Sequence, residues 1–351
     1  MVIEEPVFED VAEPELRVTP RDGRVKVGVP VLPHGLGHAG DVLAQRKLVD
    51  QMLAGLKTSK RVFWYYTPMA LLFTRHLDAD VIVFDSMDEL SAFKGAPPEL
   101  LALEEEIMGR ADVVFTGGHS LYEAKKHRHH DIHAFPSSIE TKHFARARAA
   151  DRKEPEDQAA IGHPRLGFFG VVDERFDIDL LREVAAAKPD WQFVMIGPVV
   201  KIDPADLPKG DNIHWLGGRD YKQLPDYIGG WDVGFMPFAL NESTRFISPT
   251  KTPEFLAAGL PVVSTPIHDV IRSYGDEGYV EIVKDAASVV KSAEELMAMD
   301  RAPFLERVDQ KLAENSWDQT FERIYELVVR AHDRRHSRSE GANFGKETLR
   351  V

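Results

Sequence analysis

The chain has 351 residues, of which 43% are hydrophobic and 9% aromatic, and its formal net charge is −14. This length predicts two domains of about 150 residues each, and the acidic balance argues against a partnership with nucleic acid. The absence of cysteine excludes disulfides, zinc–thiolate sites and thiol nucleophiles, and it fits a cytoplasmic protein. No apolar run approaches the roughly 20 residues of a membrane-spanning helix, so the sequence predicts a soluble protein.

Short apolar runs alternate with helical patterns through the first part of the chain. The runs predicted to be strands are Val25–Pro30, Val62–Tyr66, Val81–Asp85, Val113–Thr116 and Ile132–Phe135. Helices are predicted at Leu100–Arg110 and Ser120–Arg128, and Ser120 stands at the N-terminal cap of the second, with Glu123 at the capping-box spacing. Continuous apolar strands alternating with helices are typical of a buried parallel sheet with helices on both faces. We therefore expect residues 1–150 to form a Rossmann-like domain.

A charged, alanine-rich stretch from Ala145 to His163 interrupts this alternation and is read as a linker. The same alternation then resumes, so we expect a second Rossmann-like domain at 160–315. Its predicted strands are Arg165–Gly170, Gln192–Gly197, Ile213–Leu216, Val233–Met236, Val262–Ser264 and Val280–Val283. Its predicted helices are Ile178–Lys188, Lys222–Ile228 and Thr252–Ala258. An amphipathic helix at 316–335 is expected to cross back to the first domain, and 336–351 to be a disordered tail.

Polar side chains follow two of the predicted strands of the first domain. Asp85 and Asp88 stand at the end of one strand, where open α/β sheets place ligand groups; sugar or acceptor recognition and helix capping explain them equally well. His119 follows two glycines at the end of another strand and would face the cleft, where it could contact the acceptor or the donor sugar. The histidine-rich run 127–133 has a single aspartate beside it, which favours a solvated basic patch over a metal site.

The run NESTRFISPTKTPEFLAAGLPVVSTP, residues 241–266, carries the most chemistry. A turn at Pro249 and a proline at the first helical positions leave the amides of this helix start free to point outward. Free amides at a helix start attract phosphate. The residues expected to present these amides are Ser248, Thr250 and Thr252.

Charged residues reinforce this segment. Lys251 and Arg245 would add full positive charges beside a phosphate, and the carboxylate of Glu254 would accept hydrogen bonds from sugar hydroxyls. Gly170 and Gly197 end strands of the second domain, where a tight turn and a close ligand approach can hold at once. On spacing alone, an ordinary capped helix before a buried strand explains the run as well as a phosphate site does.

SPTKTPEFLAAGLPVVST, residues 248–265, resembles the donor-binding signature of retaining GT-B glycosyltransferases of glycosyltransferase family four. Segments 84–93, 113–144 and 211–238 resemble other parts of these enzymes, so the resemblance covers most of 81–329. It implies an α/β fold of GT-B type, with two Rossmann-like domains facing a cleft. It also implies a ribose-binding role for Glu254, an NDP-sugar co-substrate without a metal or other cofactor, and transfer with retention of configuration to a glycan, a lipid-linked or a small-molecule acceptor.

The chain departs from the family pattern at three places. Phe246 stands where an earlier glutamate is usual. The Arg and Lys usual after the first strand of the second domain are missing from their positions, so Arg175, Arg245 and Lys251 are expected to share neutralisation of the diphosphate. The chain begins as if at the second strand of the family fold, so we expect the N-terminal domain to lack its first strand–loop–helix unit.

Other functions compete with a transferase. A non-catalytic nucleotide-sugar or glycan-binding protein is favoured by Phe246 and by the N-terminal departure, and opposed by the intact Lys251–Glu254 segment. A sugar-nucleotide epimerase would need a histidine–carboxylate pair that the sequence does not place. A nicotinamide oxidoreductase is disfavoured because no G-x-G-x-x-G follows a strand. The basic stretch 125–153 is compatible with peripheral contact at the inner membrane face, although a solvated face explains it better.

Overall fold

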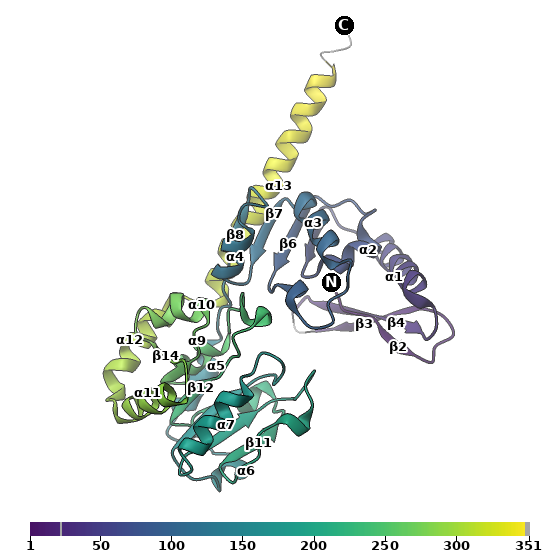
Figure 1. Cartoon of the computed structure of the whole chain (residues 1–351). Coiled ribbons are helices and arrows are strands. Elements are labelled where there is room, and N and C mark those ends of the chain that lie inside the picture. The colour runs from purple at the N-terminus through teal and green to yellow at the C-terminus, as the bar shows by residue number, and fades with distance from the viewer. Residues whose placement is uncertain (22, 348–351) are drawn as a thin grey trace. The chain divides into compact units, whose positions relative to one another are not determined.

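A computed structural model describes residues 1–21 and 23–347, with side chains described as far as Ser337. These residues form two compact units, shown in Figure 1. Unit 1 comprises residues 1–85, 98–113 and the C-terminal stretch from Arg330, and unit 2 comprises residues 86–97 and 114–329. Every strand predicted from the sequence is present, within a few residues of its expected ends.

Unit 1 begins with a small mixed sheet. Strand β4 pairs in parallel with β1 and β2 and antiparallel with β3. The elements are β1 (Val2–Ile3), β2 (Val7–Glu9), β3 (Glu15–Pro20), β4 (Lys26–Pro33) and α1 (Gly37–Ala54). Helix α1 was not predicted from the sequence, because its faces do not sort by polarity: Leu43 is 66% exposed whereas Gln45 is 8% exposed. Tertiary packing overrides the weak pattern here.

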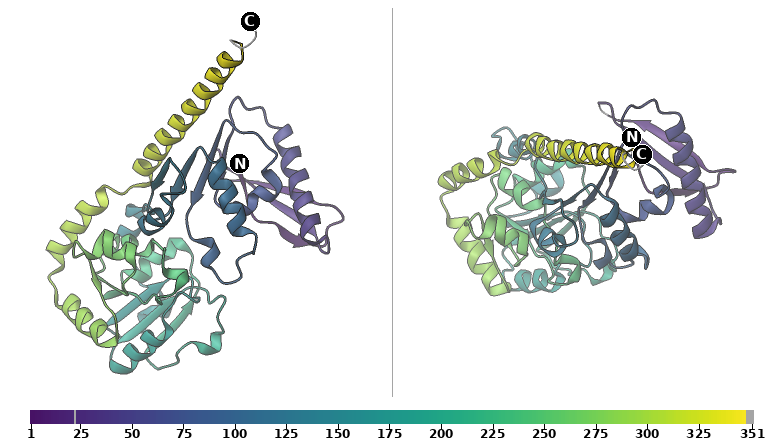
Figure 2. Two further views of the ribbon diagram at one scale, coloured as in Figure 1. Left: turned by 45° about the horizontal axis from the view of Figure 1, so that its top comes forward. Right: turned by 90° about the horizontal axis from the view of Figure 1, so that it is seen from above.

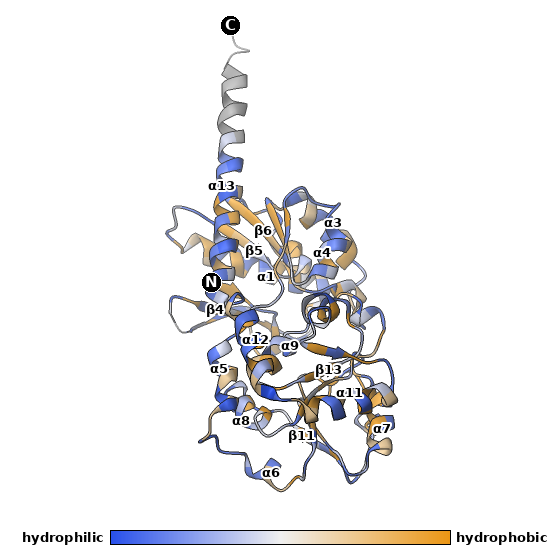
Figure 3. Cartoon of the chain, turned by 90° about the vertical axis from the view of Figure 1, so that its left-hand side faces the viewer, coloured by the Kyte–Doolittle hydropathy of each residue, from blue (hydrophilic) through white to orange (hydrophobic). Residues whose placement is uncertain are grey.

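The rest of unit 1 follows the predicted alternation. Strand β5 pairs in parallel with β6. Every residue of β6 is buried, as expected of a strand covered on both faces, and Figure 3 shows β6 in the colour of hydrophobic residues. The elements are β5 (Val62–Tyr65), α2 (Leu71–Thr74), β6 (Val81–Ser86) and α3 (Leu100–Arg110).

Unit 2 contains a parallel pair and a six-stranded parallel sheet. Strand β7 pairs with β8, and the large sheet has the order β11-β10-β9-β12-β13-β14. Teal and green helices lie beside the strands of this sheet in both views of Figure 2. The strands are β7 (Val113–Thr116), β8 (Ile132–Ala134), β9 (Arg165–Phe169), β10 (Gln192–Ile196), β11 (Ile213–Gly217), β12 (Val233–Met236), β13 (Val262–Ser264) and β14 (Val280–Ile282). The helices are α4 (His119–Lys125), α5 (Thr141–Ala145), α6 (Glu156–Ala159), α7 (Ile178–Ala187), α8 (Leu224–Ile228), α9 (Lys251–Ala257), α10 (His268–Val270), α11 (Ala286–Ala298) and α12 (Arg301–Ala313).

The last helix, α13, runs from Trp317 to Glu347. The helix therefore continues past its predicted end at residue 335, through Glu347. Residues 348–351 of the predicted tail lie outside the described residues. The hydroxyl of Thr320 contacts that of Ser138 in unit 2, at 2.6 Å, and Arg335 pairs with Asp112 in unit 1, at 2.7 Å.

Candidate functional site

The order of the six-stranded sheet reverses between β9 and β12, which lie side by side although they are the first and fourth strands in sequence. Open parallel sheets bind ligands outside the carboxyl ends of their strands at such a switch point. Gly170 follows β9 and Gly197 follows β10, with φ of +133° and +146°, in a region that favours glycine. A Cβ on Gly197 would lie 1.8 Å from the carbonyl oxygen of Gly170. The main chain is therefore packed tightly at the predicted ligand end of the sheet.

Lys251, the first residue of α9, passes directly over Gly170. A Cβ at Gly170 would lie 2.2 Å from Cε and 2.6 Å from Nζ of Lys251, and Nζ lies 5.6 Å from the centre of the Phe168 ring. Burial lowers the pKa of Lys251, and the nearby carboxylate of Glu254 opposes this shift. The lysine thus carries a largely desolvated ammonium group to the switch point, where an anion would attract it strongly.

Glu254 lies one helical turn after Lys251. Burial raises the pKa of its carboxyl to about 7, and the positive charge of Lys251 works in the opposite direction. Helix α9 begins at Lys251, and the residue at its N-cap, Thr250, makes no side-chain capping hydrogen bond. Lys251 and Glu254 are therefore brought together as predicted, in a setting suited to bind polar ligand groups.

Tyr221, which lies near Glu254, and His143, on which its ring stacks, were missed by the sequence analysis. Burial, together with the nearby carboxylates of Glu140 and Glu254, raises the pKa of Tyr221 to about 12. Its ring stacks on His143, with centroids 4.3 Å apart and planes 9° from parallel. These residues come from separate stretches of the chain, so no local pattern could have linked them.

Arg175 is the second cation at the switch point. Its Nε and Nη2 lie 2.9 and 2.6 Å from the two oxygens of Asp173, a bidentate geometry that fixes the plane of the guanidinium. Asp173 is also the group that does most to raise the pKa of Arg175. The positive charge of Arg175 also lowers the pKa of Lys251, so the two side chains lie near each other.

The remaining donor residues differ in their surroundings. Arg245 is exposed, and its partners among the described residues are Glu242, at 3.6 Å, and the Phe246 ring, at 5.1 Å from the centroid. Thr252 is buried, with its hydroxyl 3.6 Å from the sulfur of Met236 and its amide donating to the Pro249 carbonyl at 3.4 Å. Ser248 lies against Gly118, and Thr250 is exposed. Arg245 thus stands apart from the Lys251–Arg175 pair, and the Thr252 side chain faces the core.

The start of helix α4 is capped from a distance. Asp269 accepts hydrogen bonds from the amides of His119 and Ser120, both at 2.8 Å, and the helix begins after Gly118. The prediction that Ser120 caps this helix is therefore wrong: its hydroxyl is buried without a hydrogen-bond partner. A carboxylate accepting two amides satisfies the helix start better than a single hydroxyl does. Burial lowers the pKa of the His119 side chain, with Arg272 contributing in the same direction.

This cap predicts a contrast in stability. Asp269→Ala should lower the free energy of unfolding by about 2 kcal/mol, because two buried amides lose their acceptor. Ser120→Ala should change it by less than about 0.5 kcal/mol, because no hydrogen bond is lost. Urea denaturation of both variants measures the difference. Equal effects would show that Asp269 does not carry the cap.

The two aspartates predicted for the acceptor lie in different units. Asp85, in unit 1, accepts a hydrogen bond from Trp64 Nε1 at 3.0 Å, and burial raises its pKa to about 6. Asp88, in unit 2, has its pKa raised by burial, which the charge of Arg175 partly offsets. The 3₁₀ turn that follows, Leu90–Ala92, begins without a side-chain cap. The capping explanation therefore fails for that turn, and Asp88 belongs to the surroundings of Arg175.

Gly170 offers a direct test of the Lys251 geometry. Gly170→Ala should lower turnover, because the new Cβ would displace the lysine stem. It should also lower the free energy of unfolding by about 1–3 kcal/mol, because of the backbone conformation. Gly162→Ala is the matched control, since a Cβ there would meet nothing closer than 4.0 Å. Melting temperature and initial rate are the measurements, and a fully active Gly170→Ala would contradict the geometry.

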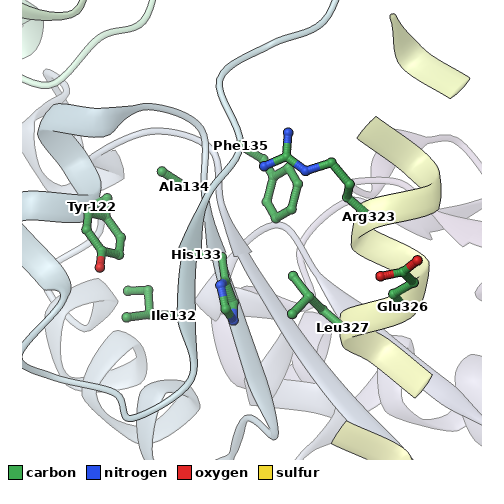
Figure 4. Close-up of a pocket in the computed structure, with 8 residues that line it drawn as sticks. All are labelled: Tyr122, Ile132, His133, Ala134, Phe135, Arg323, Glu326 and Leu327. Atoms are coloured by element: carbon green, nitrogen blue, oxygen red, sulfur yellow. The ribbon is translucent and has the colours of Figure 1, made fainter. Parts of the chain in front are cut away.

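A surface hollow of about 300 Å³ lies away from these residues, between β8 and α13 (Figure 4). The Arg323 guanidinium lies over the Phe135 ring, 5.3 Å from its centroid. None of the predicted site residues lines this hollow, whose walls are Tyr122, Ile132, His133, Ala134, Phe135, Arg323, Glu326 and Leu327.

None of the helices in residues 1–21 and 23–347 combines the length and apolarity that crossing a bilayer requires.

Parts of the chain are similar to known proteins. Residues 163–299 match the family described as glycosyl transferases group 1. Over 250 residues the chain is 28% identical to TuaH of Bacillus subtilis (strain 168), whose name assigns it to teichuronic acid biosynthesis as a glycosyltransferase. The match covers 65% of this chain and 62% of that relative.

Solved structures resemble the fold at low sequence identity. A sucrose-phosphate synthase from Thermosynechococcus elongatus superposes with a TM-score of 0.68 at 16% identity, covering 93% of this chain and 88% of that one. HepE from Anabaena, in complex with UDP and glucose, has a TM-score of 0.65 at 13% identity and covers 86% of each chain. The catalytic domain of starch synthase IV from Arabidopsis thaliana, bound to ADP and acarbose, has a TM-score of 0.61 at 11% identity, with 91% and 88% covered. These likenesses confirm the predicted α/β fold of GT-B type.

Proposed function

We propose that the protein transfers a sugar from an NDP-sugar to an acceptor hydroxyl, and the match of residues 163–299 to the family described as glycosyl transferases group 1 supports this proposal. The observation that carries the proposal is the placement of Lys251 over Gly170, with Glu254 one turn further along, at the switch point of the parallel sheet. A desolvated cation beside the start of a helix suits a diphosphate, and a half-buried carboxylate suits ribose hydroxyls.

The reaction breaks the bond between the anomeric carbon and the diphosphate oxygen and forms a bond to the acceptor oxygen. Negative charge develops on the departing diphosphate, so catalysis requires fixed positive potential there. Lys251 and Arg175 supply it, with Arg245 contributing from its exposed position. Because side-chain cations carry out this neutralisation, we propose that the reaction needs neither a metal ion nor another cofactor.

Retention of configuration completes the proposal. The acceptor attacks from the face that the diphosphate leaves, and the acceptor proton passes to a phosphate oxygen of the leaving group. The name of the relative from Bacillus subtilis supports an acceptor in polysaccharide or glycoconjugate synthesis, which Asp88 and His119 of unit 2 would contact. A cytoplasmic location with peripheral contact at the inner membrane face belongs to the same proposal.

A non-catalytic nucleotide-sugar or glycan-binding protein is the second candidate. Phe246 favours it, because this aromatic side chain packs with Arg245 where the family usually has a carboxylate. Lys251 opposes the form of this candidate that binds only glycan, since a half-buried ammonium over a glycine is costly to keep unless an anion is bound.

One experiment separates the two candidates. A thermal-shift screen of UDP, GDP and ADP identifies the nucleotide, because a ligand at about 100 times its Kd stabilises the fold by about 2.7 kcal/mol. Release of nucleotide from the matching sugar donors is then measured with a saccharide acceptor panel. Binding with turnover supports the transferase, and binding without turnover supports the second candidate. No shift with any nucleotide would refute both.

A further inference from the structure

Phe93 holds two cations on its ring. The guanidinium carbon of Arg175 lies 5.5 Å from the ring centroid, and Nζ of Lys201 lies 5.2 Å from it. Cations at such distances are attracted by the negative face of an aromatic ring. Arg175 follows β9 and Lys201 follows β10, so one side chain from residues 86–97 links the two loops that begin at Gly170 and Gly197.

Residues 86–97 are themselves anchored in unit 2. The hydroxyl of Ser243 donates to the carbonyl oxygen of Ala92 at 3.1 Å. Glu89 pairs with Lys125 at 3.1 Å, and only 2% of the lysine side chain is exposed. Phe93 therefore stands on a segment fixed on both sides of the 3₁₀ turn Leu90–Ala92, and a fixed ring can orient the charges that rest on it.

Lys201 has an unusual backbone. Among the described residues it is the one non-glycine residue with positive φ, at +62°. A conformation of this kind persists where the surroundings hold it, and it is common at binding sites. Its Nζ lies 3.8 Å from Glu174 Oε1, and both carboxylate oxygens of Glu174 are buried without a hydrogen bond. Lys201 remains 43% exposed in its side chain, so its ammonium is accessible to a ligand.

We propose that Phe93 is a positioning residue for the donor site, which holds Arg175 and Lys201 in place to meet the diphosphate of the nucleotide sugar, and that Lys201 is a further diphosphate-binding cation. This inference rests on the proposed function. Lys251 and Arg175 repel each other when no anion is bound, and Arg175 shares the Phe93 ring with a third cation, Lys201, so these side chains need other attachments. Asp173 and Glu174 offer carboxylates, and the ring of Phe93 adds an attraction that leaves the nitrogen atoms free to donate to phosphate.

The first test compares variants of Phe93. Phe93→Leu keeps an apolar side chain but loses the ring, and Phe93→Tyr keeps the ring. We expect Phe93→Leu to weaken binding of the preferred nucleoside diphosphate by about 2- to 10-fold, with little change for the matching nucleoside, which lacks phosphate. Phe93→Tyr should bind the diphosphate as the wild type does. Phe321→Leu is the control, because Phe321 is an exposed aromatic residue of α13.

The second test uses Lys201. Lys201→Gly and Lys201→Ala both remove the ammonium, but only glycine relieves the backbone. We expect equal weakening of diphosphate binding in both variants and a lower melting temperature in the alanine variant. Comparing the two variants separates the effect of the lost charge from the effect of the backbone conformation. A purely structural role of Lys201 would instead weaken diphosphate binding only in the variant with the lower melting temperature.

The outcomes are distinct. Unchanged diphosphate affinity in Phe93→Leu, or the same loss in Phe321→Leu, would overturn the positioning role. Unchanged affinity in both Lys201 variants would overturn its role as a cation. If the wild-type protein neither binds UDP, GDP or ADP nor turns over their sugars, the proposed function fails and this inference fails with it.

Discussion

Replacing Lys251 with methionine should lower turnover by about 100- to 1000-fold, the usual cost of removing one preorganised group that stabilises transition-state charge. Methionine keeps the stem that lies over Gly170 and removes the ammonium. The effect should fall mainly on kcat, because charge on the leaving diphosphate is greatest in the transition state. Affinity for the nucleoside should change little, because the ribose is assigned to Glu254.

Steady-state kinetics with the donor identified by nucleotide screening measures this effect. Lys188→Met is the control, since Lys188 pairs with Glu294 and lies over Trp191, away from the sheet switch point. A Lys251→Met enzyme with wild-type kcat would remove this residue from the chemistry. A loss seen only as a raised KM would assign it to ground-state binding instead.

The sequence predicted the elements that follow from local patterns. Strand β6 is a continuous apolar run, and a run of that kind is buried on both faces whatever surrounds it. The start of α9 was predicted for a similar reason, because Pro253 and Glu254 mark the first turn of a helix. The positions of Lys251 and Glu254 in the candidate site therefore follow from residues that are adjacent in the chain.

What the sequence could not predict depends on residues far apart in the chain. Asp269 caps α4 from 149 and 150 residues away, and the hydroxyl at Ser120, which fits the local capping pattern, makes no hydrogen bond. Phe93 reaches Arg175 and Lys201 only through the folded arrangement of three loops. Arg245 shows the converse case, because nearness in sequence to Lys251 did not bring its charge to the same place.

Glu254→Ala should weaken nucleotide binding by about 1–3 kcal/mol, or about 5- to 150-fold in Kd, because buried hydrogen bonds to ribose hydroxyls are lost. Isothermal titration with the preferred nucleoside diphosphate measures the loss, and the 2′-deoxynucleotide serves as a matched ligand. If the carboxylate binds the ribose, the deoxy ligand should lose less in the variant than in the wild type. Wild-type affinity in Glu254→Ala would remove this residue from the site.

The pH dependence of nucleotide binding gives a sharper test of Glu254. Its carboxyl has a pKa of about 7 in the free protein, so it is about half protonated at neutral pH, and hydroxyls of a ligand favour the ionised form that accepts their hydrogen bonds. Binding should therefore release protons near neutral pH and strengthen as the pH rises from about 6 to 8. Glu254→Gln, which does not titrate, corrects for ionisation of the nucleotide's own phosphate. The ratio of wild-type to Gln affinity should rise through this range and then level off.

The raised pKa of Glu254 also makes the free energy of unfolding of the unliganded protein depend on pH. The pKa rises from its ordinary 4.5 to about 7 on folding, so the folded state binds the proton more tightly than the unfolded state. The contribution of Glu254 to the free energy of unfolding is therefore complete below about pH 4.5 and is lost as the pH rises through about 7. Nucleotide binding reverses this preference by stabilising the carboxylate, so the stabilisation by ligand should grow over the pH range in which the free protein loses stability. A ligand effect that is flat with pH, in wild type and Glu254→Gln alike, would show that the ribose does not meet this carboxylate.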